Sequence, residues 1–306
     1  MSIQGNLRQA QSAAGSAYVL CTIAILCWSG NFIVGRFANL DVPPVALSFW
    51  RHVLAAILVA PWAGPRIRRD WPELRGRLGS IAVLSALFVT GNTLVYFAVN
   101  MTTVINAALI NSGQPVVTVL FSWLILRDLV DRRQSLGIAL SMIGILVVLT
   151  RADLEVFVAL DYRWGDLLMF LAIMAWALYM VLFKREGLAL SPSTMLFALM
   201  VGGSLWLAPF YVVEMSTGAV IRLTPLGLAS IGYVTFFSTL IAWACWNSAI
   251  QKIGPNRVVS FVYLFPVFGS ILAMVFLGEV LQFFHFIGTS LIVLGVSLAI
   301  RPAASR

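Results

Sequence analysis

The chain has 306 residues, of which 60% are hydrophobic and 10% are charged, and its mean hydropathy is +0.95. Soluble domains carry about 25% charged residues, so this composition excludes an ordinary water-soluble domain and predicts a protein surrounded largely by lipid. The net charge of +8 resides in short segments between apolar runs. Because no basic stripe with interleaved aromatic residues is present, the charge argues against a nucleic-acid partner.

Apolar runs long enough to cross a bilayer occur along the whole chain. A hydrocarbon core of about 30 Å takes roughly 20 apolar residues as helix, and helices satisfy every backbone polar group in lipid. We therefore expect an all-α integral membrane protein with ten transmembrane helices. Their expected ranges are 17–37, 44–62, 79–99, 103–126, 134–151, 166–184, 193–214, 226–250, 256–277 and 282–300.

Lysine and arginine concentrate in alternate connecting segments. With the N-terminus placed in the cytoplasm, fifteen of the twenty lie on the cytoplasmic side, four lie outside, and Arg51 lies within a span. The positive-inside rule therefore predicts a multi-pass protein of the bacterial plasma membrane, with both termini in the cytoplasm.

One pattern of proline, acid and glycine occurs twice in the chain, with an offset of 151 residues. Its members are Pro115, Asp128 and Gly137 in the first half and Pro266, Glu279 and Gly288 in the second. Each half holds five expected spans, and because five is odd the second half enters the membrane inverted. We expect two inverted five-helix repeats, residues 1–151 and 152–306, with a substrate site between them.

Two further motifs accompany this pattern. The first span reads Cys27-Trp28-Ser29-Gly30-Asn31-Phe32, and the second carries Phe49-Trp50-Arg51. In these motifs the chain resembles the EamA family of the drug/metabolite transporter superfamily, including its aromatic amino acid exporters. The resemblance implies ten helices in two inverted repeats and efflux of small metabolites. Asp128 stands where the family usually has glutamate.

Aromatic and polar residues share faces of several expected spans, at helical spacing. Such faces suit a flat or apolar solute that bears a few polar groups. Helix packing, with asparagine and tyrosine as interhelical hydrogen-bonding groups, is the alternative. The candidate substrate-binding residues are Trp28, Asn31, Arg51, Asn92, Tyr96, Asn111, Gln114, Trp176, Tyr179, Trp243, Asn247 and Tyr263.

Arg51 lies about seven residues into the second expected span, roughly 10 Å along the helix. It could bind a substrate carboxylate in bidentate fashion, or it could reach the outer surface or helix-end carbonyls.

The repeated residues have structural interpretations as well. Pro115 should bend the fourth span, and Pro266 could do so in the ninth. Asp128 and Glu279 could cap the next helix or gate a cavity. Gly137 and Gly288 should permit close helix contact.

These patterns predict a secondary transporter that exports small metabolites, above all neutral or aromatic amino acids, by alternating access. Exporters of nucleobases or cationic drugs are the alternative, and a channel is a weaker one. No enzyme motif, cofactor motif, metal-ligand spacing or obligatory protein partner is evident, so the expected partners are membrane lipid and a small substrate. Because Asp166 and Glu214 lie near span ends, we expect facilitated transport or exchange rather than strict proton antiport.

Overall fold

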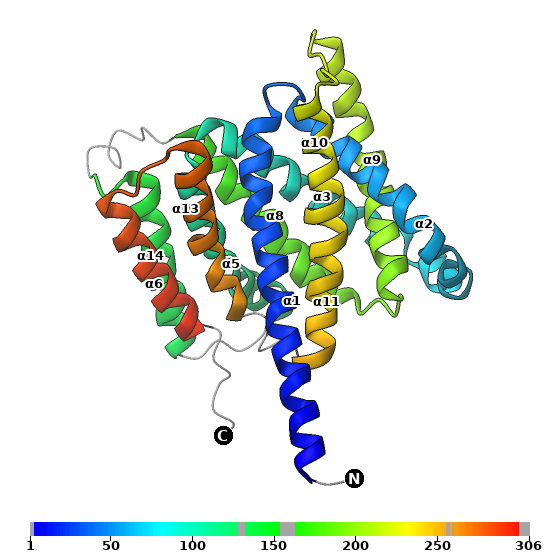
Figure 1. Cartoon of the computed structure of the whole chain (residues 1–306), viewed down its shortest axis with the longest axis horizontal. Helices are drawn as coiled ribbons and strands as arrows, with labels where there is room; N and C mark the ends of the chain where they lie inside the picture. Colours follow the sequence, from blue (N-terminus) through cyan, green and yellow to red (C-terminus); the bar gives the residue numbers. More distant parts are fainter. Residues whose placement is uncertain (1–2, 128–131, 154–162, 255–257, 259, 300–306) are drawn as a thin grey trace.

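The computed structural model describes residues 3–127, 132–153, 163–254, 258 and 260–299, so Asp128 lies outside the described part. Within that part all regular structure is helical. Helix α1 (Ile3–Ala38) begins and α14 (Phe283–Ala299) ends at the same end of the bundle, the lower end in Figure 1. Helix α1 ends and α2 begins at the opposite end, which we call the upper end.

Among the described residues, eight helices are long and apolar enough to cross a membrane, and two shorter apolar helices follow them, Phe261–Leu277 and Phe283–Leu298. The unbroken helices after α1 are α2 (Pro44–Gly76), α3 (Leu78–Met101), α6 (Arg132–Thr150), α8 (Trp164–Glu186) and α9 (Pro192–Ser216). Three further spans are built from shorter helical segments. The first joins α4 (Val104–Ser112), α5 (Gln114–Phe121) and the π-helical η1 (Ser122–Leu126). The second joins α10 (Pro225–Tyr233), the π-helical η2 (Val234–Ile241) and α11 (Ala242–Ile253), and the third joins the 3₁₀ segment η3 (Ser260–Tyr263) to α13 (Leu264–Leu277).

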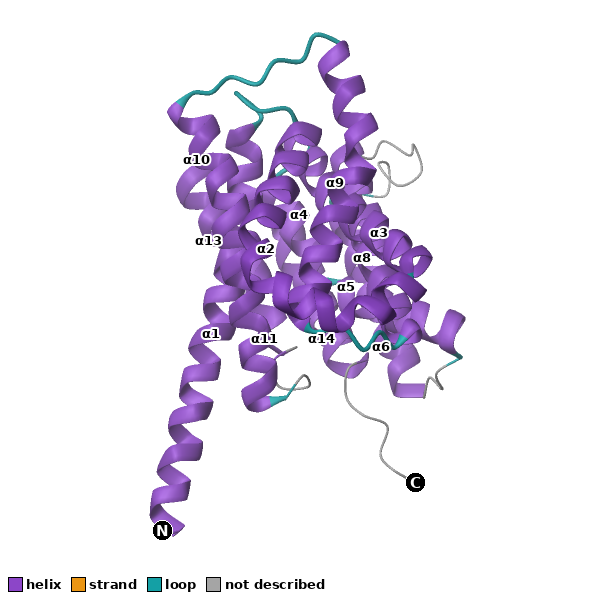
Figure 2. Ribbon diagram, turned by 90° about the vertical axis from the view of Figure 1, so that its right-hand side faces the viewer, coloured by secondary structure: helices purple, strands orange, loops and turns teal. Residues whose placement is uncertain are grey.

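Helices α1 and α2 are longer than the spans expected from the sequence. Helix α1 has 36 residues, and Figure 2 shows its first turns extending beyond the rest of the bundle. Helix α2 has 33 residues and continues through Pro61, Pro65 and Pro72. Each proline removes only one N–H, and water can satisfy the freed carbonyls of this exposed, arginine-rich segment. The sequence-based limit near residue 62 therefore marks the end of the apolar stretch and not the end of the helix.

The fourth span breaks where Pro115 predicts a bend. Helix α4 ends at Ser112, the Gly113 N–H donates to Ile110 O at 3.0 Å, and Pro115 occupies the first turn of α5. A proline costs little there, because first-turn N–H groups have no intrahelical partner. Pro266 similarly occupies the first turn of α13, directly after η3. It therefore starts a helix and does not bend one.

Helices from the two halves of the chain pack against one another. Helix α1 packs with α11, α2 with α9, α3 with α8, α4 with α13, and α6 with α14. Helices α6 and α14 approach so closely that their contact leaves no room for a side chain at two glycines. A Cβ added at Gly295 would lie 2.5 Å from Gly137 O, and one added at Gly288 would lie 2.5 Å from Val148 Cγ2. This arrangement brings side chains of both halves together in the interior of the bundle.

Candidate functional site

A buried arginine forms the centre of the candidate site. Arg51 of α2 is 4% exposed. Its Nε donates to Thr239 Oγ1 at 2.6 Å, and its Nη1 donates to Tyr96 Oη at 2.9 Å. Tyr96 Oη in turn donates to Asn31 Oδ1 at 3.0 Å. This network, which we call the Arg51 network, joins α1, α2 and α3 of the first half to η2 of the second. Arg51 therefore neither reaches the surface nor bonds a helix-end carbonyl.

The π-helical turn of η2 shapes one wall of the Arg51 network. Thr239 Oγ1 donates to Val234 O, five residues earlier, at 2.8 Å, and the Trp28 Nε1–H donates to Ser238 O at 3.0 Å. A π turn widens the helix and frees carbonyls for partners outside it, and such turns are frequent at functional sites. Trp28 thus helps to hold η2 in the shape that presents Thr239 to Arg51.

The electrostatics of the Arg51 network are unbalanced. Within the described residues no carboxylate lies within 4.0 Å of the Arg51 guanidinium, and its two partners are neutral hydroxyls. The same elements carry three buried hydroxyls without a hydrogen-bond partner in the described structure, those of Ser29, Thr235 and Ser238. A buried cation surrounded only by neutral groups is costly unless an anion compensates it. The network is therefore suited to binding a small anion or carboxylate.

An aromatic cluster adjoins this polar network along α3. Phe88 lies 4.8 Å from Trp176 and 5.5 Å from Tyr179 between ring centroids, and both partners belong to α8. Asn92 lies between Phe88 and Tyr96 on the same face of α3, and its Nδ2 donates to Phe88 O at 2.8 Å. The face of α3 thus changes from polar at Tyr96 to aromatic at Phe88.

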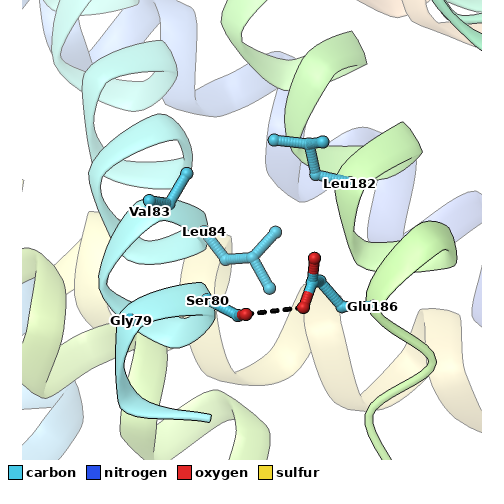
Figure 3. A pocket seen from close by; sticks show the side chains of 6 residues that line it. All are labelled: Gly79, Ser80, Val83, Leu84, Leu182 and Glu186. Atoms are coloured by element: carbon cyan, nitrogen blue, oxygen red, sulfur yellow. Dashed lines mark hydrogen bonds between the residues drawn. The ribbon is translucent and has the colours of Figure 1, made fainter. Parts of the chain in front are cut away.

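A pocket of about 270 Å³ opens near the lower ends of α3 and α8 (Figure 3). Leu84 and Leu182 line it, one turn from Phe88 and Tyr179 respectively, so the pocket lies next to the aromatic cluster. Two lining residues are joined by a hydrogen bond, in which Ser80 Oγ donates to Glu186 Oε2 at 2.5 Å.

The structure does not bring all the other predicted site residues into one cluster. Trp28 stacks at a tilt on Trp246, with ring centroids 5.2 Å apart, and so does not share a cluster with Trp176. Trp243 packs against the hydrophobic cluster that contains Phe88, and Asn247 Nδ2 donates to Trp243 O at 2.8 Å. The remaining three are half-buried at the α4–α5 break and in η3; they are Asn111, Gln114 and Tyr263.

Three carboxylates cap helices across the bundle. Glu214 at the end of α9 accepts from the N–H groups of Val45 (3.0 Å) and Ala46 (2.8 Å) at the start of α2. Asp70, near the end of α2, accepts from Ser191 N at 2.9 Å, at the start of α9. These two caps are reciprocal, and each places a negative charge at a helix N-terminus.

Glu279 is the third cap, and here the sequence-based expectation needs correction. Its carboxylate accepts from Val104 N (2.7 Å) and Ile105 N (2.9 Å) at the start of α4, and not from the next helix, α14. The reason is packing, because α4 lies against α13, so the end of α13 meets the start of α4.

Sequence reasoning missed several members of the site. Helical spacing puts Thr239 on one face of its span with Trp243 and Asn247, but Thr239 was not selected as a substrate-binding candidate. Thr235 and Ser238 give only the weak signal of a polar residue in an apolar stretch. A lone acid at the end of an apolar stretch is the signal for Asp70 and Glu214, but it does not tell which helix the acid caps.

The fold and the site together define a multi-pass helical membrane transporter with a polar site between its two halves. The EamA-like transporter family model matches residues 15–150 and 163–301, so the chain belongs to this family, within the drug/metabolite transporter superfamily. The family is one of transporters and not of enzymes.

Relatives of known sequence agree with this assignment. The chain is 30% identical to an uncharacterized transporter, YyaM, of Bacillus subtilis, over 88% of this chain and 87% of that protein. It is 24% identical to a probable amino-acid metabolite efflux pump of Salmonella typhimurium (90% and 92% covered) and 25% identical to an uncharacterized inner membrane transporter, YedA, of Escherichia coli (95% and 91%). A protein crystal structure shares the fold, with a TM-score of 0.60 and 18% identity over 93% of this chain and 96% of that one.

Proposed function

We propose that this chain is a secondary transporter that exports neutral or aromatic amino acids across the bacterial plasma membrane. The observation that carries the proposal is the buried Arg51 guanidinium, which has hydroxyl partners but no carboxylate partner among the described residues. The α-carboxylate of an amino acid would compensate this charge with bidentate hydrogen bonds. The Salmonella relative named as an amino-acid metabolite efflux pump supports the same substrate class.

The aromatic cluster would receive the substrate side chain. Trp176 and Tyr179 offer flat apolar surface beside the polar face of α3, which suits a ring or aliphatic group attached to a charged backbone. The alternative cargo of cationic drugs is disfavoured, because a buried arginine repels a cation. Nucleobases, which are flat and weakly polar, remain the alternative to amino acids.

Transport would proceed by alternating access between two inverted repeats, residues 1–151 and 152–306. Five pairs of helices, each with one member from either half, support this view, as do the reciprocal caps of α2 and α9 by Glu214 and Asp70. The lower end, with the start of α1 and the arginine-rich end of α2, would face the cytoplasm. Ten helices, including the two shorter ones, would then cross the membrane.

Counterflow tests this function. Proteoliposomes are loaded with unlabelled phenylalanine and given labelled phenylalanine outside, with no ion gradient. A carrier accumulates label transiently, and a channel does not. Loss of a hydrogen bond to a charged group costs about 1.5–3 kcal/mol of binding free energy, so Arg51→Gln should raise the half-saturation concentration for phenylalanine roughly 10- to 150-fold. Arg66→Gln, an exposed change on the same helix, is the control. Unchanged counterflow in Arg51→Gln contradicts the proposal. If counterflow is seen with a labelled nucleobase but not with labelled phenylalanine, the alternative cargo is favoured.

A further inference from the structure

A second polar site lies at the upper end of the bundle, away from Arg51. Asp166 in the first turn of α8 is completely buried. Its Oδ1 accepts from Thr102 Oγ1 at 2.5 Å, and Asn106 Nδ2 donates to Oδ1 and Oδ2 at 3.2 and 3.1 Å. All three bonds come from neutral groups, and no described cation lies within salt-bridge distance. A carboxyl group buried in this way is readily neutralised by a proton.

A histidine lies on the other side of Asn106. The Gln282 N–H donates to His285 Nδ1 at 2.8 Å, so Nδ1 carries no proton. Nε2, which lies 2.9 Å from Asn106 Oδ1, must therefore be the N–H that donates. Asn106 then presents its oxygen to His285 and its NH₂ to Asp166. A proton added to His285 would break the Gln282 bond at the start of α14, whereas a proton added to Asp166 meets no such conflict.

The charged groups around Asp166 are otherwise occupied or more distant. Arg36 of α1 donates to the terminal carbonyls of α3, Val99 O and Thr102 O, and the Glu279 carboxylate caps α4. Arg163 and Arg151 act on Asp166 only through longer-range attraction. No facing group therefore holds Asp166 permanently in its ionised form.

We propose that Asp166 is the proton-binding residue of a proton–substrate antiport. This proposal rests on the function proposed above and replaces the expectation of uncoupled exchange, which was based on the position of Asp166 and Glu214 near span ends. As an anion, Asp166 accepts three hydrogen bonds that join α8 to α3 and α4. Once protonated, Asp166 carries no charge, so its bonds to Thr102 and Asn106 are no longer charge-assisted and become weaker.

Proton binding thus loosens the upper end of the bundle, which faces outward in the proposed orientation. After the substrate has left the outward-open form, Asp166 takes up a proton from the outside, and the protonated, substrate-free carrier returns to the inward-open form. There the proton leaves to the cytoplasm, and the ionised carrier then changes conformation only with substrate bound. Each cycle returns one proton to the cytoplasm for one substrate exported, and no other reactant is needed. The proton gradient of the plasma membrane would then drive export.

The test uses the full chain in proteoliposomes with labelled phenylalanine, at zero membrane potential. A lumen one pH unit more acidic than the outside should drive accumulation up to about 10-fold, the limit for one proton per substrate. Asp166→Asn should keep counterflow but accumulate no label above the outside concentration. Asp153→Asn, an exposed acid beyond α6, is the matched control and should accumulate label as the wild type does.

The outcomes separate the two proposals. Wild-type counterflow without gradient-driven accumulation overturns the antiport, as does accumulation by Asp166→Asn. Absence of wild-type counterflow with phenylalanine and with nucleobases defeats the proposed function itself.

Should Asp166→Asn fail to fold, Thr102→Val decides the matter. It removes the donor at 2.5 Å that favours the anion and preserves side-chain shape. The pH at which gradient-driven uptake is half-maximal should rise by about 0.5–1 unit. An unchanged midpoint overturns the proposal.

Discussion

Tyr96→Phe tests the Arg51 network through stability as well as transport. Tyr96 is completely buried, and its hydroxyl accepts from Arg51 Nη1 at 2.9 Å and donates to Asn31 Oδ1 at 3.0 Å. Phenylalanine has the same shape, so the change leaves no cavity and removes only the hydroxyl. Two buried polar groups lose a partner, and each costs about 1–3 kcal/mol, so the variant should lose about 2–6 kcal/mol of unfolding free energy.

Thiol reactivity measures this loss directly, because Cys21 and Cys27 are buried free thiols that become reactive on unfolding. At about 2–4 °C per kcal/mol for a chain of this size, Tm should fall by roughly 4–24 °C. Phenylalanine at saturating concentration should restore part of the loss, since its carboxylate would bond the freed Nη1. Tyr18→Phe, on the exposed part of α1, is the control and should change Tm little. A Tyr96→Phe protein that melts and transports as the wild type does would refute the assignment of this network.

Three further predictions concern the helix caps, the α6–α14 contact and the aromatic cluster. Glu214→Gln and Asp70→Asn each weaken a charged cap, so each should lower the free energy of unfolding by about 1 kcal/mol in the same thiol assay. Glu73→Gln is the control and should lower it by nothing measurable. Equal Tm values for all three variants would contradict the reciprocal capping. Gly295→Ala places a Cβ 2.5 Å from Gly137 O and should lower the free energy of unfolding by about 1–3 kcal/mol. Gly15→Ala, whose Cβ meets nothing within 4 Å, is the control and should be neutral or stabilising. A Gly295→Ala protein as stable as the wild type would mean that the α6–α14 contact is looser than described. Trp176→Leu should raise the half-saturation concentration for phenylalanine in counterflow several-fold more than that for alanine, and equal effects on both amino acids exclude Trp176 from side-chain recognition.

Much of the helical architecture could be predicted from the sequence, because lipid permits few alternatives. Apolar runs of about 20 residues located the spans, and Pro115 located the break between α4 and α5. The lower limit of α2 could not be predicted in this way, since hydropathy reports where lipid ends, and a helix can continue into water past Pro61.

The site was only partly predictable for a different reason. Asn31, Arg51 and Tyr96 were each recognisable as polar or aromatic residues on an apolar helix, and the structure joins them in one network. Their partner Thr239 depends on the π turn of η2, which no local sequence signal indicates. Burial of Asp166 and the helix capped by Glu279 depend on which helices pack together, and periodicity within one helix does not contain that information.

The central claim is that Arg51 binds the carboxylate of the transported molecule. The most direct measurement compares phenylalanine with phenylalaninamide, which has nearly the same shape but lacks the carboxylate charge, as inhibitors of labelled phenylalanine counterflow. The account predicts that the wild type prefers phenylalanine by roughly 10-fold or more and that Arg51→Gln loses this preference. Equal inhibition of the wild type by both compounds, or an unchanged preference in Arg51→Gln, would contradict it.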